Sequence, residues 1–214
     1  MIKAVLFDFD GVIANSEIIH MRSFQELLAP LGIKISIKRW FTEFTGTGSR
    51  YVVEKLFNEY KINQDVQIWL DKRKKLYLSY VKKGLVKPKA GAVELVKKLR
   101  KQDILVAIVS NSHSPSIQPV LENFGLTDSI DLMICGEDVK NKKPAPDGYL
   151  LAAKRLNLQV SECVCIEDSK SGMVSVKAAG MKLVCLRTAA CTNYEKCDAV
   201  VGSLRRFPIR ILTK

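Results

Sequence analysis

The first apolar run of the chain predicts a buried strand that ends in two carboxylates. Residues 4–7 and Phe9 are apolar, Asp8 and Asp10 alternate with them, and Gly11 marks a turn. A short run rich in Val, Leu and Phe that ends at a turn residue is typical of a strand at the centre of a parallel sheet. Because side chains alternate along a strand, Asp8 and Asp10 should project to the same side at its carboxyl end, where open α/β sheets bind ligands.

The next stretch, residues 16–86, has helical rather than strand-like periodicity. Apolar residues recur three and four positions apart in it, for example Val53 and Leu56. No run of comparable length resembles the first strand, so we expect an inserted helical subdomain. Between its helices we expect a hydroxyl-rich loop, residues 45–50, that ends in Arg50. This arginine is either an anion contact or an ordinary exposed side chain.

From Pro88 onward, helical and strand-like segments alternate. Further strands are predicted at residues 104–109, 132–135, 163–166, 183–186 and 199–201. Right-handed crossovers between such strands build a doubly wound parallel sheet. The sequence therefore predicts an α/β fold in which residues 1–15 and 87–214 form the core and residues 16–86 form an α-helical cap placed as a lid.

Polar side chains follow the second predicted strand and stand in the loop after the third. Ser110 and Asn111 come directly after residues 104–109 and precede a helix. Their side chains and the backbone can hold a phosphate, or they can serve as helix N-caps. Lys143 precedes Pro144, and a proline restricts the backbone on both sides. A lysine aimed in this way can supply a fixed positive charge.

A second acidic cluster, Glu167 and Asp168, follows the strand predicted at residues 163–166. Carboxylates in mostly apolar segments need a counter-charge, because an unpaired buried charge is costly. For Asp8 and Asp10 alone, helix capping or pairing with surface lysines would be an alternative. With the second cluster they provide enough oxygen ligands for Mg²⁺.

The formal net charge of +12 suggests anionic partners. The basic residues are spread along helical segments, without nucleic-acid-binding motifs or interleaved aromatic residues. We therefore expect mostly solvated helix faces and a small phosphorylated substrate, with no specific nucleic-acid partner. No apolar run approaches the roughly 20 residues of a membrane span, and the first segment lacks a signal-peptide pattern. The expectation is a cytoplasmic protein without membrane contact, whose oligomeric state the sequence does not predict.

The six cysteines predict neither a disulfide framework nor a metal site. Four of them lie in or at the ends of apolar runs and are expected to be small buried side chains: Cys135, Cys163, Cys165 and Cys185. Cys191 and Cys197 form no recognisable motif. The pattern is consistent with a reducing compartment.

Four short motifs occur in order across nearly the whole chain. They are D-x-D-G-V at residues 8–12, V-S-N at 109–111, K-P-x-P-D at 143–147 and E-D-S-x-x-G at 167–172. The chain thereby resembles the haloacid dehalogenase superfamily, in particular the helical-cap branch with β-phosphoglucomutase-like and phosphoglycolate-phosphatase-like enzymes. The resemblance implies a Mg²⁺-dependent phosphatase that hydrolyses a small phosphorylated metabolite, such as a sugar phosphate.

The resemblance also implies roles for the acidic residues. Asp8 would be the nucleophile that forms an aspartyl-phosphate. Asp10 would donate a proton to the leaving alcohol and later accept one from water. Asp8, the backbone carbonyl of Asp10 and Asp168 would hold Mg²⁺, with Glu167 assisting.

By the same resemblance, Ser110 and Lys143 would bind the transferring phosphoryl group, with Asn111 in its surroundings. In the cap, His20 and Arg50 match positions that β-phosphoglucomutase-like enzymes use for proton transfer and for binding the distal phosphate. For His20, helix packing is the alternative.

Two alternative functions stay open, a phosphosugar mutase and a receiver-like phosphoacceptor module without catalysis. The acid at Asp10 argues against a dehalogenase, which lacks it. Thr45, Gly48 and Asn15 depart from the residues usual in mutases. An inserted helical cap is hard to explain in a receiver module.

Overall fold

The computed structural model describes residues 1–188 and 194–213. The chain divides into two compact units, one of Met1–Asn15 with Lys87–Lys214 and one of Ser16–Val86. The first unit is an α/β layer structure and the second is helical. The predicted fold class, a doubly wound parallel sheet with an inserted helical subdomain, is confirmed.

The first unit is built on a six-stranded parallel sheet in the order β5-β4-β1-β6-β7-β8. Its strands are β1 (Ala4–Phe7), β4 (Leu105–Val109), β5 (Leu132–Ile134), β6 (Cys163–Glu167), β7 (Lys182–Leu186) and β8 (Ala199–Val201). All four residues of β1 are buried, as its apolar run predicts. Because β1 pairs with β4 on one side and β6 on the other, the polar residues that follow these three strands meet at one edge.

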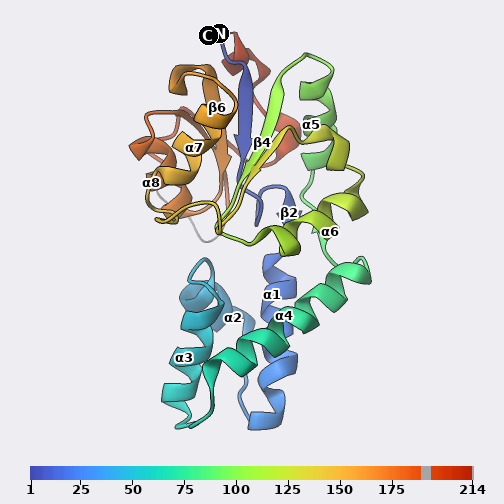
Figure 1. Ribbon diagram of the computed structural model, residues 1–214, viewed down its shortest axis with the longest axis vertical. Helices are drawn as coiled ribbons and strands as arrows, with labels where there is room; N and C mark the ends of the chain where they lie inside the picture. The colour runs from blue at the N-terminus through green and yellow to red at the C-terminus, as the bar shows by residue number, and fades with distance from the viewer. Residues whose placement is uncertain (189–193, 214) are drawn as a thin grey trace. The chain divides into compact units, whose positions relative to one another are not determined.

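Helices cover both faces of this sheet (Figure 1). They are α5 (Ala92–Arg100), α6 (Ser114–Phe124), α7 (Asp147–Arg155) and α8 (Lys170–Ala178). Short 3-10 helices connect or end elements: η3 (Thr127–Ser129), η4 (Val160–Glu162), η5 (Leu204–Arg206) and η6 (Ile209–Leu212). Residues 11–13 form the turn that Gly11 predicts, and β2 (Ala14–Asn15) then pairs antiparallel with β3 (Lys87–Pro88).

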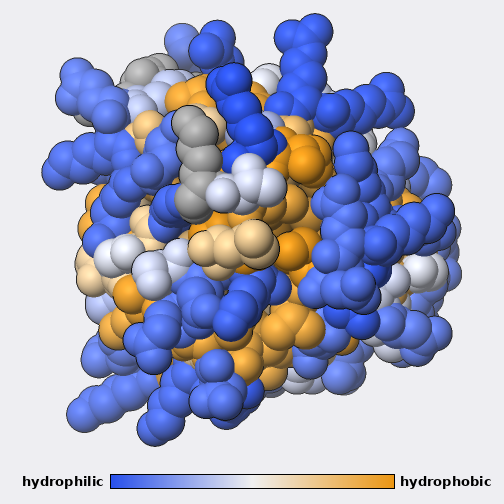
Figure 2. Space-filling view, turned by 90° about the horizontal axis from the view of Figure 1, so that it is seen from above, coloured by the Kyte–Doolittle hydropathy of each residue, from blue (hydrophilic) through white to orange (hydrophobic). Residues whose placement is uncertain are grey.

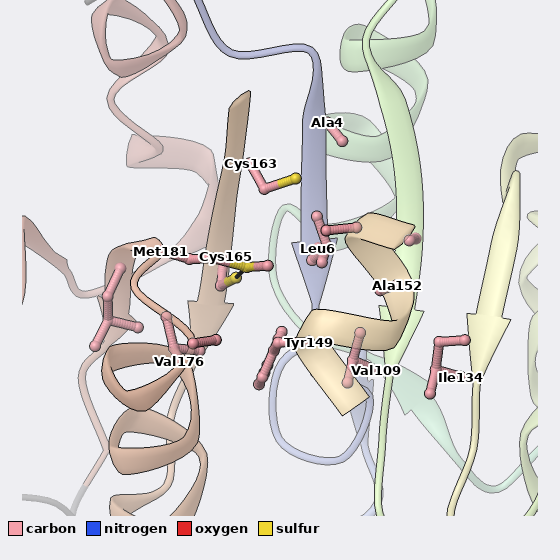
Figure 3. Close-up of a cluster of buried hydrophobic side chains, with 14 of the residues drawn as sticks. Ala4, Leu6, Val109, Ile134, Tyr149, Ala152, Cys163, Cys165, Val176 and Met181 are labelled. Atoms are coloured by element: carbon pink, nitrogen blue, oxygen red, sulfur yellow. Dashed lines mark hydrogen bonds between the residues drawn. The ribbon is translucent and has the colours of Figure 1, made fainter. Parts of the chain in front are cut away.

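The core under α7 and α8 consists of apolar side chains from alternating strand positions. Figure 3 shows Leu6 of β1, Val109 of β4 and Cys165 of β6 next to Tyr149 of α7 and Val176 of α8. Each of these residues has at most 2% of its surface exposed. This packing fixes α7 and α8, and with them the loops at the carboxyl edge of the sheet.

The second unit has its own hydrophobic core. Its elements are α1 (Glu17–Leu28), the 3-10 helix η1 (Ala29–Leu31), α2 (Ile37–Arg39), the π-helix η2 (Trp40–Phe44), α3 (Ser49–Glu59) and α4 (Val66–Lys82). Phe24, Trp40, Leu56 and Trp69 lie in its buried cluster. The expected loop at residues 45–50 is shorter than predicted, because α3 already begins at Ser49.

The prediction that the cysteines form no disulfide was wrong for one pair. Cys185 and Cys197 form a disulfide, with their Cα atoms 6.1 Å apart. The two residues meet because the chain returns after β7 to start β8 beside it, a pairing that the cysteine spacing does not reveal. Cys135, Cys163 and Cys165 are free and buried, as predicted. Cys191 lies outside the described residues.

The basic side chains are largely solvated, as predicted. Lys72, Lys74 and Lys75 of α4 and Lys97 and Lys98 of α5 are exposed. Figure 2 shows hydrophilic side chains covering much of one face, with hydrophobic groups between them. Across residues 1–188 and 194–213, no helix has the length and apolar character that a membrane span requires.

Candidate active site

Asp8 and Asp10 directly follow β1 at the carboxyl edge of the sheet. Asp8 continues the strand geometry, since its backbone N–H donates to the carbonyl of Ile166 at 3.0 Å. Its side chain is buried, with 8% of the residue exposed. Asp10 is half-buried, and its Oδ2 accepts a hydrogen bond of 2.6 Å from the hydroxyl of Ser112.

Lys143 connects this strand to the neighbouring ones. Its Nζ lies 2.7 Å from Oδ1 of Asp8, 2.6 Å from Oε1 of Glu167 and 2.7 Å from the carbonyl oxygen of Val109. Only 6% of its side chain is exposed. Hydrogen bonds between charged partners at these distances are among the strongest in proteins. The loop residue predicted to supply a fixed positive charge is thus placed between two of the predicted carboxylates.

Ser110 and Asn111 follow β4 and border the same group. Ser110 is buried, and its hydroxyl oxygen accepts a hydrogen bond from the backbone N–H of Ser112 at 3.0 Å. The Asn111 side chain accepts from the backbone N–H of Lys143 at 3.0 Å and donates to the carbonyl oxygen of Lys143 at 3.3 Å. Asn111 therefore holds the backbone of Lys143, which leaves the lysine side chain aimed at Asp8.

Glu167 ends β6 and is completely buried. Its Oε2 accepts hydrogen bonds from the backbone N–H of Asp168 and the hydroxyl of Ser169, both at 3.2 Å. A glycine makes room for this carboxylate, because a Cβ on Gly172 would lie 1.9 Å from its Cδ. Asp168 approaches the first strand's turn just as closely, since a Cβ on Gly11 would lie 2.1 Å from its Oδ2.

The charges at this edge do not balance. The carboxylates of Glu167, Asp168 and Asp10 all act on Asp8, and the ammonium of Lys143 is the positive charge that acts on it. Burial, followed by the charge of Glu167, holds the pKa of Asp8 well above its ordinary value despite Lys143. Burial alone would lower the pKa of Lys143, but the charges of Asp8 and Glu167 outweigh it and raise this pKa.

The residues present fit a divalent cation. Asp8, Glu167 and Asp168 offer ligand atoms that all lie within 4.8 Å of one another. Buried carboxylates with too little positive charge around them favour a metal ion, and Mg²⁺ in particular takes oxygen ligands.

Tyr149 and Ser112 belong to this site but were not predicted from the sequence. The Tyr149 hydroxyl donates a hydrogen bond of 2.8 Å to Oε1 of Glu167. Burial, and then the nearby charge of Glu167, raise the pKa of Tyr149 well above its ordinary value, so the phenol stays a donor. In the sequence, Tyr149 is an aromatic residue near the start of a predicted helix, which fits an ordinary core position equally well.

His20 and Arg50 lie in the helical unit and are described within it. His20 of α1 stacks on Tyr77, with ring centroids 4.4 Å apart, and its Nδ1 contacts the guanidinium of Arg73. Arg50 of α3 donates to Oε1 of Gln67 at 2.7 Å and is more than half exposed.

A parallel sheet with a helical insertion and an acidic, lysine-bearing carboxyl edge defines a class of α/β enzymes. The match to known families is specific: residues 5–186 match the model of the haloacid dehalogenase-like hydrolases. The chain belongs to this family.

Several named proteins are similar to the chain. The Arabidopsis thaliana protein SUPPRESSOR OF QUENCHING 1, chloroplastic, is 30% identical over 197 residues, which cover 87% of this chain but 18% of that longer protein. The putative phosphatase YhcW of Bacillus subtilis is 28% identical over 218 residues, covering 99% of this chain and 96% of the relative. Hexitol phosphatase B of Escherichia coli is 30% identical over 186 residues, covering 86% and 82%.

Solved structures share the fold. CbbY from Rhodobacter sphaeroides in complex with phosphate matches with a TM-score of 0.84 and 23% identity over 97% of both chains. A β-phosphoglucomutase from Clostridium difficile matches with a TM-score of 0.81 and 25% identity, covering 100% of this chain and 96% of that one.

Proposed function

We propose that this protein is a Mg²⁺-dependent phosphatase that hydrolyses a small phosphorylated metabolite, such as a sugar phosphate. The observation that carries the proposal is the position of the Lys143 ammonium, 2.7 Å from Asp8 and 2.6 Å from Glu167. A nucleophilic carboxylate beside a fixed cation is what phosphoryl transfer needs, because this reaction depends mainly on positioning and charge stabilisation. Relatives named as phosphatases support the same reaction.

Asp8 attacks phosphorus and becomes an aspartyl-phosphate, while the bond between phosphorus and the leaving oxygen breaks. Asp10 donates a proton to that oxygen, and in the second step it takes a proton from the water that hydrolyses the aspartyl-phosphate. The hydrogen bond from Ser112 to Oδ2 orients the Asp10 carboxyl group in the present structure.

Lys143 and Ser110 bind the oxygens of the transferring phosphoryl group, and Asn111 keeps the Lys143 backbone in place. Asp8, the backbone carbonyl of Asp10 and Asp168 would hold Mg²⁺, with Glu167 assisting. The ion, when bound, neutralises charge on the phosphoryl oxygens. We propose residues 16–86 as the cap domain, with His20 and Arg50 as its substrate contacts.

A phosphosugar mutase is the second candidate, because the fold is shared with a β-phosphoglucomutase at 25% identity. Its test supplies β-glucose 1-phosphate with a trace of the bisphosphate. Accumulation of glucose 6-phosphate would indicate a mutase, whereas release of free phosphate would indicate a phosphatase.

The proposed function is tested with a panel of phosphorylated metabolites and a chromogenic phosphomonoester, by measuring phosphate release with and without Mg²⁺. Wild-type protein should release phosphate only with the metal, and Asp8→Asn should abolish the release. Arg50→Ala and His20→Ala should change the preference among substrates and leave hydrolysis of the chromogenic ester nearly unchanged. Sustained turnover by Asp8→Asn would contradict both the phosphatase and the mutase proposal.

A further inference from the structure

Tyr149 places a polar group where the core is otherwise apolar. The residue is fully buried in the first turns of α7, among the side chains of the cluster in Figure 3. A phenylalanine would fill the same space, and a buried phenol is costly unless its hydroxyl is hydrogen-bonded. The hydroxyl donates to Oε1 of Glu167 at 2.8 Å, so its position is tied to the site rather than to packing alone.

The same tyrosine contacts both members of the buried ion pair. Nζ of Lys143 lies 2.6 Å from Oε1 of Glu167 and 5.0 Å from the centroid of the Tyr149 ring. The ring face offers the ammonium a favourable cation–π contact, and the hydroxyl binds the oxygen that the ammonium also binds. Tyr149 and Lys143 therefore share one acceptor atom.

The backbone next to Tyr149 allows this close approach. Gly148 precedes it, and a Cβ at Gly148 would lie 3.0 Å from Cγ1 of Val109 on β4. The carbonyl of Val109 is itself an acceptor for Lys143. The absence of a side chain at Gly148 lets α7 sit close to β4, which sets the depth at which Tyr149 meets Glu167.

Sharing one oxygen has a consequence for Lys143. Without the phenol, Oε1 of the fully buried Glu167 would keep Lys143 as its one donor in the described part of the chain, and its charge would draw the ammonium more strongly. With the phenol, part of that charge is satisfied by a neutral donor. The ammonium then stays available to Asp8 and to the phosphoryl group that Asp8 receives.

We propose that Tyr149 is a positioning residue, whose hydroxyl holds Oε1 of Glu167 so that the Lys143 ammonium stays shared between Glu167 and Asp8. The inference rests on the proposed phosphatase function, and it adds a residue that acts through Lys143 rather than on the substrate. It distinguishes this chain from one with phenylalanine at this position.

The test is Tyr149→Phe, which keeps the ring and removes the hydroxyl. We expect kcat/KM to fall about tenfold, as for loss of one hydrogen bond to a charged group. Calorimetric titration with inorganic phosphate in the presence of Mg²⁺ should show a similar loss of affinity. This second readout does not need turnover, so it separates failure of the inference from failure of the proposed function.

Tyr80→Phe is the matched control. The Tyr80 hydroxyl also donates to a carboxylate, that of Glu26, but within the helical unit. A purely structural role for Tyr149 would lower the urea midpoint in both variants and leave kcat/KM and phosphate affinity unchanged in Tyr149→Phe. That result would overturn the inference.

A double-mutant cycle with Glu167→Gln gives an independent check. Because the proposed effect passes through the Glu167 charge, Tyr149→Phe should have no further effect on phosphate affinity in the Glu167→Gln background. If Tyr149→Phe alone does not fold, the double variant should fold, since the under-satisfied charge is gone. Additive losses in the cycle, or a double variant that also fails to fold, would contradict the inference.

Discussion

The ammonium of Lys143 lies 2.7 Å from Oδ1 of Asp8, and 6% of the lysine side chain and 11% of the aspartate side chain are exposed. When one partner of so deeply buried a pair is removed, water cannot reach the remaining charge to solvate it. The structural and the chemical role of Lys143 are therefore coupled, and both can be measured.

Lys143→Met should lower the free energy of unfolding by about 3–5 kcal/mol in metal-free buffer, because it leaves Asp8 and Glu167 without their buried counter-charge. Urea unfolding at neutral pH measures this. Lys177→Met is the control, since Lys177 pairs with Asp198 at 2.7 Å where about a third of each side chain is exposed, and such pairs contribute about 0–1 kcal/mol. Equal losses in the two variants would contradict the burial argument.

Gly172→Ala should disturb Glu167 directly, because the new Cβ would lie 1.9 Å from the glutamate Cδ. Overpacking of this kind costs about 1–3 kcal/mol, and the displaced carboxylate should also weaken Mg²⁺ binding measured by calorimetry. A Cβ at Gly202 meets no atom within 4 Å, so Gly202→Ala should change neither quantity. Unaltered Mg²⁺ affinity in Gly172→Ala would argue that Glu167 does not assist the metal.

The raised pKa of Asp8 predicts a pH-dependent stability in metal-free protein. Because the folded-state pKa lies above the ordinary 3.8, the stability contributed by Asp8 is fully present below that pH and is lost as the pH rises through the raised value. The side chain at this position in Asp8→Asn cannot ionise. As the pH rises from acid to neutral, the free energy of unfolding of this variant should therefore increase relative to that of the wild type.

Asp198→Asn should show the opposite slope in the same measurement. Burial would raise the pKa of Asp198, but hydrogen bonds from Lys177 and from the backbone of Leu183 outweigh it and lower this pKa. Its stabilising effect is therefore present above pH 3.8 and is lost as the pH falls through the lowered value.

If the difference in free energy of unfolding between Asp8→Asn and the wild type does not change with pH, the pKa of the Asp8 carboxyl is not perturbed.

The disulfide between Cys185 and Cys197 should stabilise the α/β unit by about 2–4 kcal/mol. Urea unfolding with and without a dithiol reductant measures this contribution. The wild-type midpoint should fall on reduction, whereas Cys197→Ser should start at the lower midpoint and not respond to the reductant. If the urea midpoint of the wild type does not change when the reductant is added, the disulfide does not form in solution.

The strands could be predicted because they are locally encoded. The run at residues 163–166 differs from the observed β6 by one residue, and the first strand was placed from its apolar pattern alone. Features that depend on pairing between distant segments of the chain could not be predicted from the sequence. The antiparallel partner of Asn15 is Lys87, on the far side of the helical insertion in the chain. The disulfide partner of Cys197 likewise follows from the position of β8 beside β7.

The same limit applies to the site. Asp8 and Glu167 stand at strand ends and Lys143 stands directly before Pro144, where the residue type is unusual enough to be noticed. Tyr149 occupies a helical position where an aromatic residue is ordinary. Only the three-dimensional register of α7 against β6 shows that its hydroxyl meets Glu167.

We propose that Asp8 accepts the phosphoryl group. Acid quenching during steady-state turnover of a phosphomonoester, followed by peptide mass spectrometry, can detect this intermediate. We expect one phosphoryl group on the peptide that contains Asp8 in wild-type protein, and none in Asp8→Asn. A phosphoryl group on another residue, or turnover by Asp8→Asn without a phosphorylated peptide, would contradict it.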